Sequence, residues 1–442
     1  MKYNVIILIG IVICINSCRM PADPIGNVKI IKRLEVINTR GDCLDLDVDI
    51  EDSVLVAAAN YNGYFVYKIN SINGIVSNIT EQKHIGVNEM DTNLGDNRAQ
   101  SVVLSKNHNI AFVMDQYDHI WLYKYEDGST QYSTPNYLEE DCYGSTWLSV
   151  AIDDQTDSIG VYTLLKHNSA EDEAGDFLEY STSLVWTSLN GIDPSSISPD
   201  QDEPNCEYII NIGSIAEKIY FDDGLLSVAY GELGVRVFEK TAELQCTVNG
   251  ESQNLIGSSL CNEHLYPLDH PFEGAINYQS CCETTSICPD AFLNLCGEEC
   301  CPEFVFGYGG LFSSAGGIIP TIHAQFDTPG EVEVIFSEDN NIFAGLKYSN
   351  GCVLTQLDDD GNIINTNQFA IGYSVNGIHQ NNGLLALATG NNGILLYNWS
   401  GSNVSFMGII ETSYANNVKV AGNIIFAATE DGIEIIQIDF FP

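Results

Sequence analysis

Hydrophobic and polar positions repeat in one pattern along the chain: an apolar strand, a short polar turn that ends in Gly, and a second apolar strand. The clearest copies are residues 54–67, 225–238, 342–355, 384–397 and 424–437. Turn dipeptides such as Asn62-Gly63 and Asn392-Gly393 suit tight hairpins, because the central residues of these turns need positive φ. A hairpin cannot bury its own apolar face, so the recurrence predicts a fold of stacked repeats.

Two weaker copies, at 110–123 and 159–186, bring the predicted number of units to seven. A short strand precedes each unit, and we expect it to be the innermost strand of its sheet: Leu44–Val48, Ser101–Leu104, Leu148–Ile152, Lys218–Phe221, Val332–Phe336, Val375–His379 and Val418–Val420. The last unit ends at Ile438 without an outer strand, whereas residues 28–37 form a strand without a unit. The pattern therefore predicts an all-β, seven-bladed β-propeller closed by this N-terminal strand, which removes an open sheet edge.

The hairpins resemble those of the LVIVD-repeat β-propellers, a family of bacterial extracytoplasmic proteins, most clearly at 384–397 and 424–437. The family pattern is a small-hydrophobic strand, an Asp, and then Gly-Leu before a second hydrophobic strand. In this chain Asn60, Gly231, Gly390 and Glu430 stand near the position of that Asp. The resemblance implies the fold and a location outside the cytoplasm, and it brings no single activity with it.

The chain has 14 cysteines, and eight of them lie in a region without propeller periodicity, 241–316. We interpret this region as a disulfide-rich insertion in the fourth blade, because a small polar segment of an exported protein needs bridges in place of a core. Its cysteines are Cys246, Cys261, Cys281, Cys282, Cys288, Cys296, Cys300 and Cys301. Their pairing stays open, and zinc ligation is the alternative, although two clean Cys-x-x-Cys pairs are missing.

The N-terminus has the pattern of an export signal. Lys2 precedes an apolar run, Val5–Ile15, that is too short to span a membrane. The following Asn16-Ser17-Cys18 resembles a bacterial lipobox, which implies lipidation of Cys18 and, with Arg19 next, an outer-membrane or cell-surface location. The expected organisation is a signal peptide at 1–18, a tether at 19–27, propeller at 28–240, the insertion at 241–316 and the remaining blades at 317–442.

Charge narrows the possible partners. The chain carries 60 acidic and 17 basic residues, a formal net charge of −43. This charge argues against nucleic acid and against electrostatic docking on anionic lipid, and it favours cations and basic partners. The alternative is a general adaptation of the surface to high salt, which screens self-repulsion.

A candidate metal site lies on the predicted innermost strands. Asp45, Asp47 and Asp49 alternate with apolar residues, so period two places their carboxylates on one side of a strand. If that side faces the central channel, Asp45 and Asp47 would lie near oxygen-bearing side chains of other blades: Glu217, Asn376 and Asn416. Clustered oxygen ligands suit Ca²⁺. The simpler interpretation is that these are solvent-facing acids, and that His379, also on an innermost strand, lines a hydrated channel.

No nucleophile elbow, zinc-helix motif or phosphate-binding glycine loop is present. We therefore expect a non-catalytic binding or scaffold propeller, a monomer that contacts an envelope or extracellular protein or a glycan through long loops at 81–98, 126–145 and 166–178. One alternative is a calcium-dependent hydrolase of the lactonase or esterase kind, with the metal in the channel. Another is a purely structural envelope component.

Overall fold

The structure is a computed structural model, and it describes residues 28–72, 75–86, 98–116, 120–125, 130–133, 145–155, 158–167, 181–188, 206–210, 216–239, 306–307, 310–311 and 322–440. Every regular element within these ranges is a β-strand. No helix long and apolar enough to cross a membrane occurs in this part of the chain.

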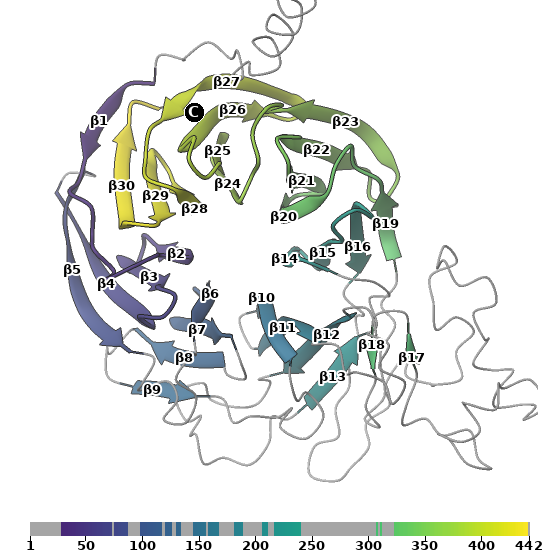
Figure 1. Cartoon of the computed structure of the whole chain (residues 1–442), viewed down its shortest axis with the longest axis horizontal. Coiled ribbons are helices and arrows are strands. Elements are labelled where there is room, and N and C mark those ends of the chain that lie inside the picture. The colour runs from purple at the N-terminus through teal and green to yellow at the C-terminus, as the bar shows by residue number, and fades with distance from the viewer. Residues whose placement is uncertain are drawn as a thin grey trace, which may run out of the picture.

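Six four-stranded antiparallel sheets follow one another around a ring, and each takes its strands in chain order from the centre to the rim (Figure 1). The first three sheets consist of β2 (Asp45–Asp49), β3 (Val54–Ala58), β4 (Tyr64–Ile72) and β5 (Ile75–Ile85); β6 (Ala99–Ser105), β7 (Ile110–Asp115), β8 (Ile120–Lys124) and β9 (Thr130–Ser133); and β10 (Ser145–Gln155), β11 (Ser158–His167), β12 (Ser181–Ser188) and β13 (Cys206–Ile210). The next three consist of β14 (Lys218–Asp222), β15 (Leu225–Ala229), β16 (Val235–Glu239) and β19 (Ile322–Phe326); β20 (Val332–Glu338), β21 (Asn341–Leu346), β22 (Cys352–Leu357) and β23 (Ile363–Phe369); and β24 (Gly377–Asn381), β25 (Leu384–Ala388), β26 (Ile394–Ser400) and β27 (Asn403–Ile410).

A composite sheet closes the ring from both ends of the chain. It contains β28 (Ala415–Ala421), β29 (Ile424–Thr429) and β30 (Gly432–Ile438), and β1 (Ile30–Arg33) pairs antiparallel with β30 on its outer side. The prediction of a seven-bladed fold is corrected accordingly: the described chain has six blades that are complete in themselves, and the remaining sheet exists only as a composite of both ends. Its outer strand is the predicted N-terminal one, shortened to four residues.

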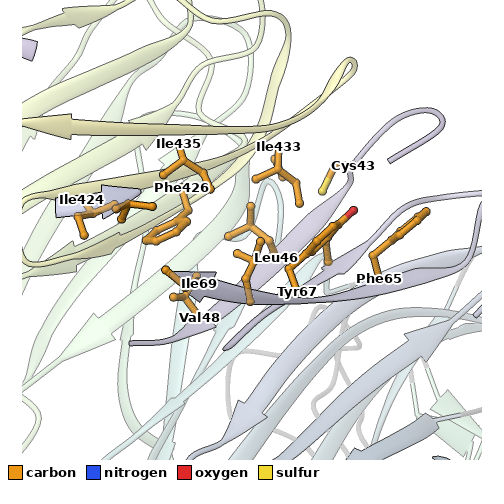
Figure 2. Close-up of a cluster of buried hydrophobic side chains, with 14 of the residues drawn as sticks. Cys43, Leu46, Val48, Phe65, Tyr67, Ile69, Ile424, Phe426, Ile433 and Ile435 are labelled. Atoms are coloured by element: carbon orange, nitrogen blue, oxygen red, sulfur yellow. The ribbon is translucent and has the colours of Figure 1, made fainter. Parts of the chain in front are cut away.

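Neighbouring sheets bury their faces against each other, which makes the central strands apolar on both sides. At the closure, Leu46, Phe65 and Tyr67 of the first sheet pack against Phe426 and Ile435 of the composite sheet, as Figure 2 shows. All residues of β3 and β29 are buried. Burial of apolar surface stabilises the fold by about 25 cal/mol per Å². A strand that is covered on both faces buries the side chains of both, which explains why its sequence is a continuous apolar run.

The aligned glycines of the hairpins have a steric cause. Gly63 and Gly393 have φ of 79° and 76°, and a Cβ at either position would collide with a carbonyl oxygen of the outer strand, that of Ile85 or Ile410. Only glycine fits here, because the turn needs positive φ and the glycine Cα lies against the backbone of the rim strand. This contact explains why Gly recurs at the start of the third strand.

The strands also change some predicted boundaries. The predicted loop 81–98 begins inside β5, which runs to Ile85, and β9 interrupts the predicted loop 126–145. The fourth sheet resumes at Ile322, a few residues after the predicted end of the insertion. Within 241–316 the described residues are the two short strands β17 (Phe306–Gly307) and β18 (Gly310–Leu311). The signal peptide, the tether and the eight clustered cysteines lie outside the described residues.

Candidate functional site

The three carboxylates of β2 are buried at the junction between the first and second blades. Asp45, Asp47 and Asp49 are 5%, 8% and 3% exposed. Innermost strands are sheet edges, so N–H groups on their open side need partners other than a β-ladder. The carboxylates of β2 accept such bonds from the neighbouring innermost strand β6, and the period-two pattern turns all three toward that blade.

Asp45 binds donors from both of its neighbouring blades. Its Oδ2 accepts hydrogen bonds from Ser101 Oγ at 2.8 Å and from the backbone N–H of Val102 at 3.0 Å. Its Oδ1 accepts from the N–H of Leu46 at 2.8 Å and from the Asn417 side-chain amide of β28. A buried carboxylate with four donors is compensated for the loss of water, so Asp45 joins the first blade to the second and to the composite one.

Asp47 and Asp49 repeat this arrangement further along the strand. Asp47 Oδ2 accepts the N–H of Leu104 at 2.9 Å, and its Oδ1 lies 3.3 Å from Lys419 Nζ of β28. Asp49 Oδ2 accepts the hydroxyl of Tyr125 at 3.0 Å. Burial and the adjacent Asp49 charge raise the pKa of Tyr125, so this phenol stays protonated as a donor at neutral pH.

The other predicted ligands lie at separate junctions. Asn376 directly precedes the innermost strand β24, and Asn416 is the second residue of the innermost strand β28. Their amides donate to the next sheet: Asn376 Nδ2 to Ala415 O at 3.1 Å, and Asn416 Nδ2 to Cys43 O at 2.8 Å. Glu217 Oε1 lies 3.5 Å from Lys347 Nζ, between the fourth and fifth blades. Asn416 thus lies at the same junction as Asp45 and Asp47, but the residues of β28 that contact these acids are Asn417 and Lys419. Asn376 and Glu217 contact other blades. Within the described ranges, no three His, Cys, Asp or Glu side chains form a group suited to a metal ion.

His379 lies on the innermost strand β24, as the sequence predicts, and has the same bonding role as the acids. Its Nδ1 accepts the N–H of Val420 on β28 at 3.1 Å. Burial, reinforced by the charges of Lys419 and Lys106, holds the pKa of His379 well below its usual range. The ring is therefore neutral, and its acceptor Nδ1 places the proton on Nε2.

Sequence reasoning missed a second acidic group, at the turn between β20 and β21. Asp222 Oδ2 accepts the N–H of Asp339 at 3.2 Å, and Glu338 Oε2 is buried without a hydrogen-bond partner in the described chain. Burial, with the charges of Asp339 and Asp222, raises the pKa of Glu338 to about 7. These acids belong to different blades, so only the fold brings them together.

Large apolar side chains are exposed on one face of the ring, which we call the turn face. It is defined by Tyr61, Leu233 and Tyr348 in turns between second and third strands, and by Ile371 between β23 and β24, with exposures of 51%, 49%, 77% and 61%. The loops of the fifth blade are fixed to each other, because Gly372 N donates to Ser349 O at 2.8 Å. Acids lie in the loop of Leu233 and in other loops on the same face: Glu232, Asp42, Asp327, Glu411, Glu430 and Asp431. An acidic face with anchored apolar side chains is the strongest candidate for a binding surface in the described chain.

Comparison with solved structures supports the fold. A chain of the "Crystal Structure of Mitotic Checkpoint Complex" is 11% identical with a TM-score of 0.51, and the match covers 96% of both chains. The structure of "RRP9 WD40 repeats" is 10% identical with a TM-score of 0.51, and the match covers 94% of this chain and 99% of that one. At such identities the likeness shows the β-propeller fold and nothing finer. No family model matches the sequence, and no curated protein matches it.

Replacing Asp45 by Ala should destabilise the ring by about 3 kcal/mol or more, because several donors, among them the N–H groups of Val102 and Leu46, lose their acceptor in a buried junction. We expect the fall in Tm to be equal with and without millimolar Ca²⁺ after metal stripping. Asp431→Ala, in an exposed turn, is the control and should melt like the wild type. A Ca²⁺-dependent rise in Tm that Asp45→Asn and Glu217→Gln abolish would instead support the channel metal site.

Glu338 should make stability depend on pH. Its folded-state pKa of about 7 lies above its ordinary 4.5, so its contribution is fully present below the unfolded value and is lost as the pH rises through about 7. Glu338→Gln should therefore melt like the wild type at about pH 4.5 and at a higher temperature at about pH 8. Glu51→Gln, at an exposed turn, is the control. An equal effect of Glu338→Gln at both pH values would contradict the assignment.

Proposed function

We propose that this protein is a non-catalytic binding propeller, anchored by a lipid at Cys18 to the bacterial outer membrane or cell surface, whose turn face holds a protein partner. The observation that carries the proposal is the contrast between the two parts of the fold. Asp45, Asp47 and His379 of the innermost strands accept inter-blade hydrogen bonds. Tyr348 and Ile371, by contrast, are exposed on loops fixed to each other. A rigid frame with exposed apolar anchors is typical of protein recognition.

The proposed family is a divergent branch of the LVIVD-repeat propellers. The backbone at the family's Asp position supports this relationship. Asn60, Gly231 and Gly390 all have positive φ, at 52°, 56° and 59°, and all form bridges to the next innermost strand, at Ala99, Val332 and Ala415. Asn, Gly and Asp are the residues that tolerate this conformation, so the substitutions keep the backbone geometry while they remove the carboxylate.

The partner is expected to be an envelope or extracellular protein with a basic, partly apolar surface. The acids around the turn face would meet its cations, and Tyr348 and Ile371 would fill its apolar hollows. The net charge of −43 makes an acidic partner unfavourable and favours fast association with a basic one.

A photocrosslinking amino acid tests the turn face in cells that express the full chain. At Tyr348 it should give a discrete crosslinked protein, which is then purified and shown to bind the mature protein directly. The matched control is Ile50, which is 39% exposed at a turn between first and second strands, on the opposite face. Absence of any crosslinked protein at Tyr348, Tyr61 and Leu233 would exclude the proposed partner.

Lipid attachment has a separate test, because binding and anchoring are independent. Cys18→Ser should abolish incorporation of radiolabelled palmitate and release the protein from the membrane fraction, while the melting temperature of the propeller stays unchanged. Cys14→Ser, four residues earlier in the apolar run, is the matched control and should keep both properties. Retention of the label in Cys18→Ser would refute the lipoprotein assignment.

A further inference from the structure

The fifth blade carries the three most exposed large hydrophobic side chains of the described chain: Tyr348, Ile364 and Ile371, at 77%, 66% and 61%. Tyr348 and Ile371 lie on the turn face, whereas Ile364 and Ile363, which is 50% exposed, lie at the opposite end of the blade's outer strand. Ile363 and Ile364 begin β23, the outer strand, which lies at the rim in Figure 1. Consecutive exposed isoleucines at the start of a rim strand need an explanation, because water contact of this kind is unfavourable.

The strand lacks the charged side chains that usually protect a sheet edge. Natural edge strands carry charges that repel added strands, as β5 does with Glu81 and Lys83. The sequence of β23 is IINTNQF, without charge or Pro, and none of its residues is fully buried. The rim strand β27 is also uncharged, but its last residue, Ile410, is only 1% exposed and packs in a core cluster. Among the outer strands whose burial is described, β23 is the uncharged one that has no buried residue.

The strand β23 has one neighbour in the sheet, β22, and its register shifts once, at Ile364. It pairs with β22 over six residue pairs, from Cys352↔Phe369 to Leu357↔Ile363. No backbone hydrogen bond outside that ladder involves its residues within the described chain. The groups that point away from β22 can therefore pair with an additional strand.

Charge near the strand selects the partner. The turn before β23 carries Asp358, Asp359 and Asp360, and the chain has no Lys or Arg between Lys347 and Lys419. A second copy of this chain, with its own charge of −43, would be repelled, whereas a basic segment would be attracted to the acidic end of the strand.

We propose that β23 binds an extended, basic segment of a partner protein as an added fifth strand of its blade. The inference rests on the proposed binding function and specifies its chemistry. The ladder supplies affinity through backbone hydrogen bonds, β-branched side chains of the partner cover Ile364 and Thr366, and a terminal Lys or Arg pairs with Asp358–Asp360.

The probe is a fluorescent peptide with Lys at each end and seven alternating Val and Thr residues between, the length of β23. A second peptide has the same sequence with alternate backbone nitrogens methylated, which removes N–H donors without changing the side chains. The protein variants are Thr366→Lys, at the exposed centre of β23, and its matched control Ser405→Lys, at an exposed position of the rim strand β27. Ile364→Lys repeats the test in case Thr366→Lys lowers the melting temperature.

Fluorescence anisotropy should show saturable binding of the first peptide to the full mature protein. Thr366→Lys should raise Kd by about tenfold or more through repulsion of the basic strand, and Ser405→Lys should leave it unchanged. The methylated peptide should not saturate. Equal binding of both peptides, or equal Kd for both variants, would overturn the inference, as would no binding at all. If the peptide results overturn the inference but crosslinking at Tyr348 persists, the proposed function stands, and the partner binds the turn face alone.

Discussion

The structure depends on the hydrogen bonds that join neighbouring innermost strands. These strands end their sheets at the centre of the ring, so the N–H groups on their open side have no ladder partner and would be costly if left buried and unpaired. Side chains of the preceding blade accept them: Asp45 for Val102, Asp47 for Leu104 and His379 for Val420. Apolar packing between blades supplies most of the free energy, but it is non-directional, and these bonds fix how one blade meets the next.

The turns between second and third strands are also joined to the next blade by backbone hydrogen bonds. The residues Asn60, Gly231 and Gly390 form backbone bridges to the next innermost strand, and each needs positive φ to do so. Asn and Gly tolerate this conformation better than other residues, so the backbone accounts for the residue types at this position. The candidate ligand Asp45 also takes part in the contacts between blades, and a carboxylate that bonds two blades has few lone pairs left for an ion.

The sequence predicts the hairpins, the innermost strands and the closing N-terminal strand well, because each follows from short-range periodicity or turn chemistry. It does not predict what the carboxylates of β2 contact, because Ser101, Tyr125, Asn417 and Lys419 are distant in sequence and meet Asp45, Asp47 or Asp49 only when the ring is formed. Lys419 between Val418 and Val420 was a signal for one of these contacts, since a lone cation on an apolar strand needs an acid nearby. The grouping of Asp222 with Glu338 had no signal, because it joins two blades.

The distribution of the few cations separates the frame from the surface that can bind. Lys419 pairs with Asp47 and Lys347 with Glu217 and Glu331, so both are used where blades meet. Between these two lysines the chain contains no other Lys or Arg, and this stretch forms most of the rim and turns of the fifth and sixth blades. Cations that neutralise buried junctions stabilise the ring without lowering the acidity of its outer surface. Under the proposed function, a partner that approaches the acidic end of β23 would meet carboxylates and exposed isoleucines together, a combination that would favour basic segments with apolar side chains.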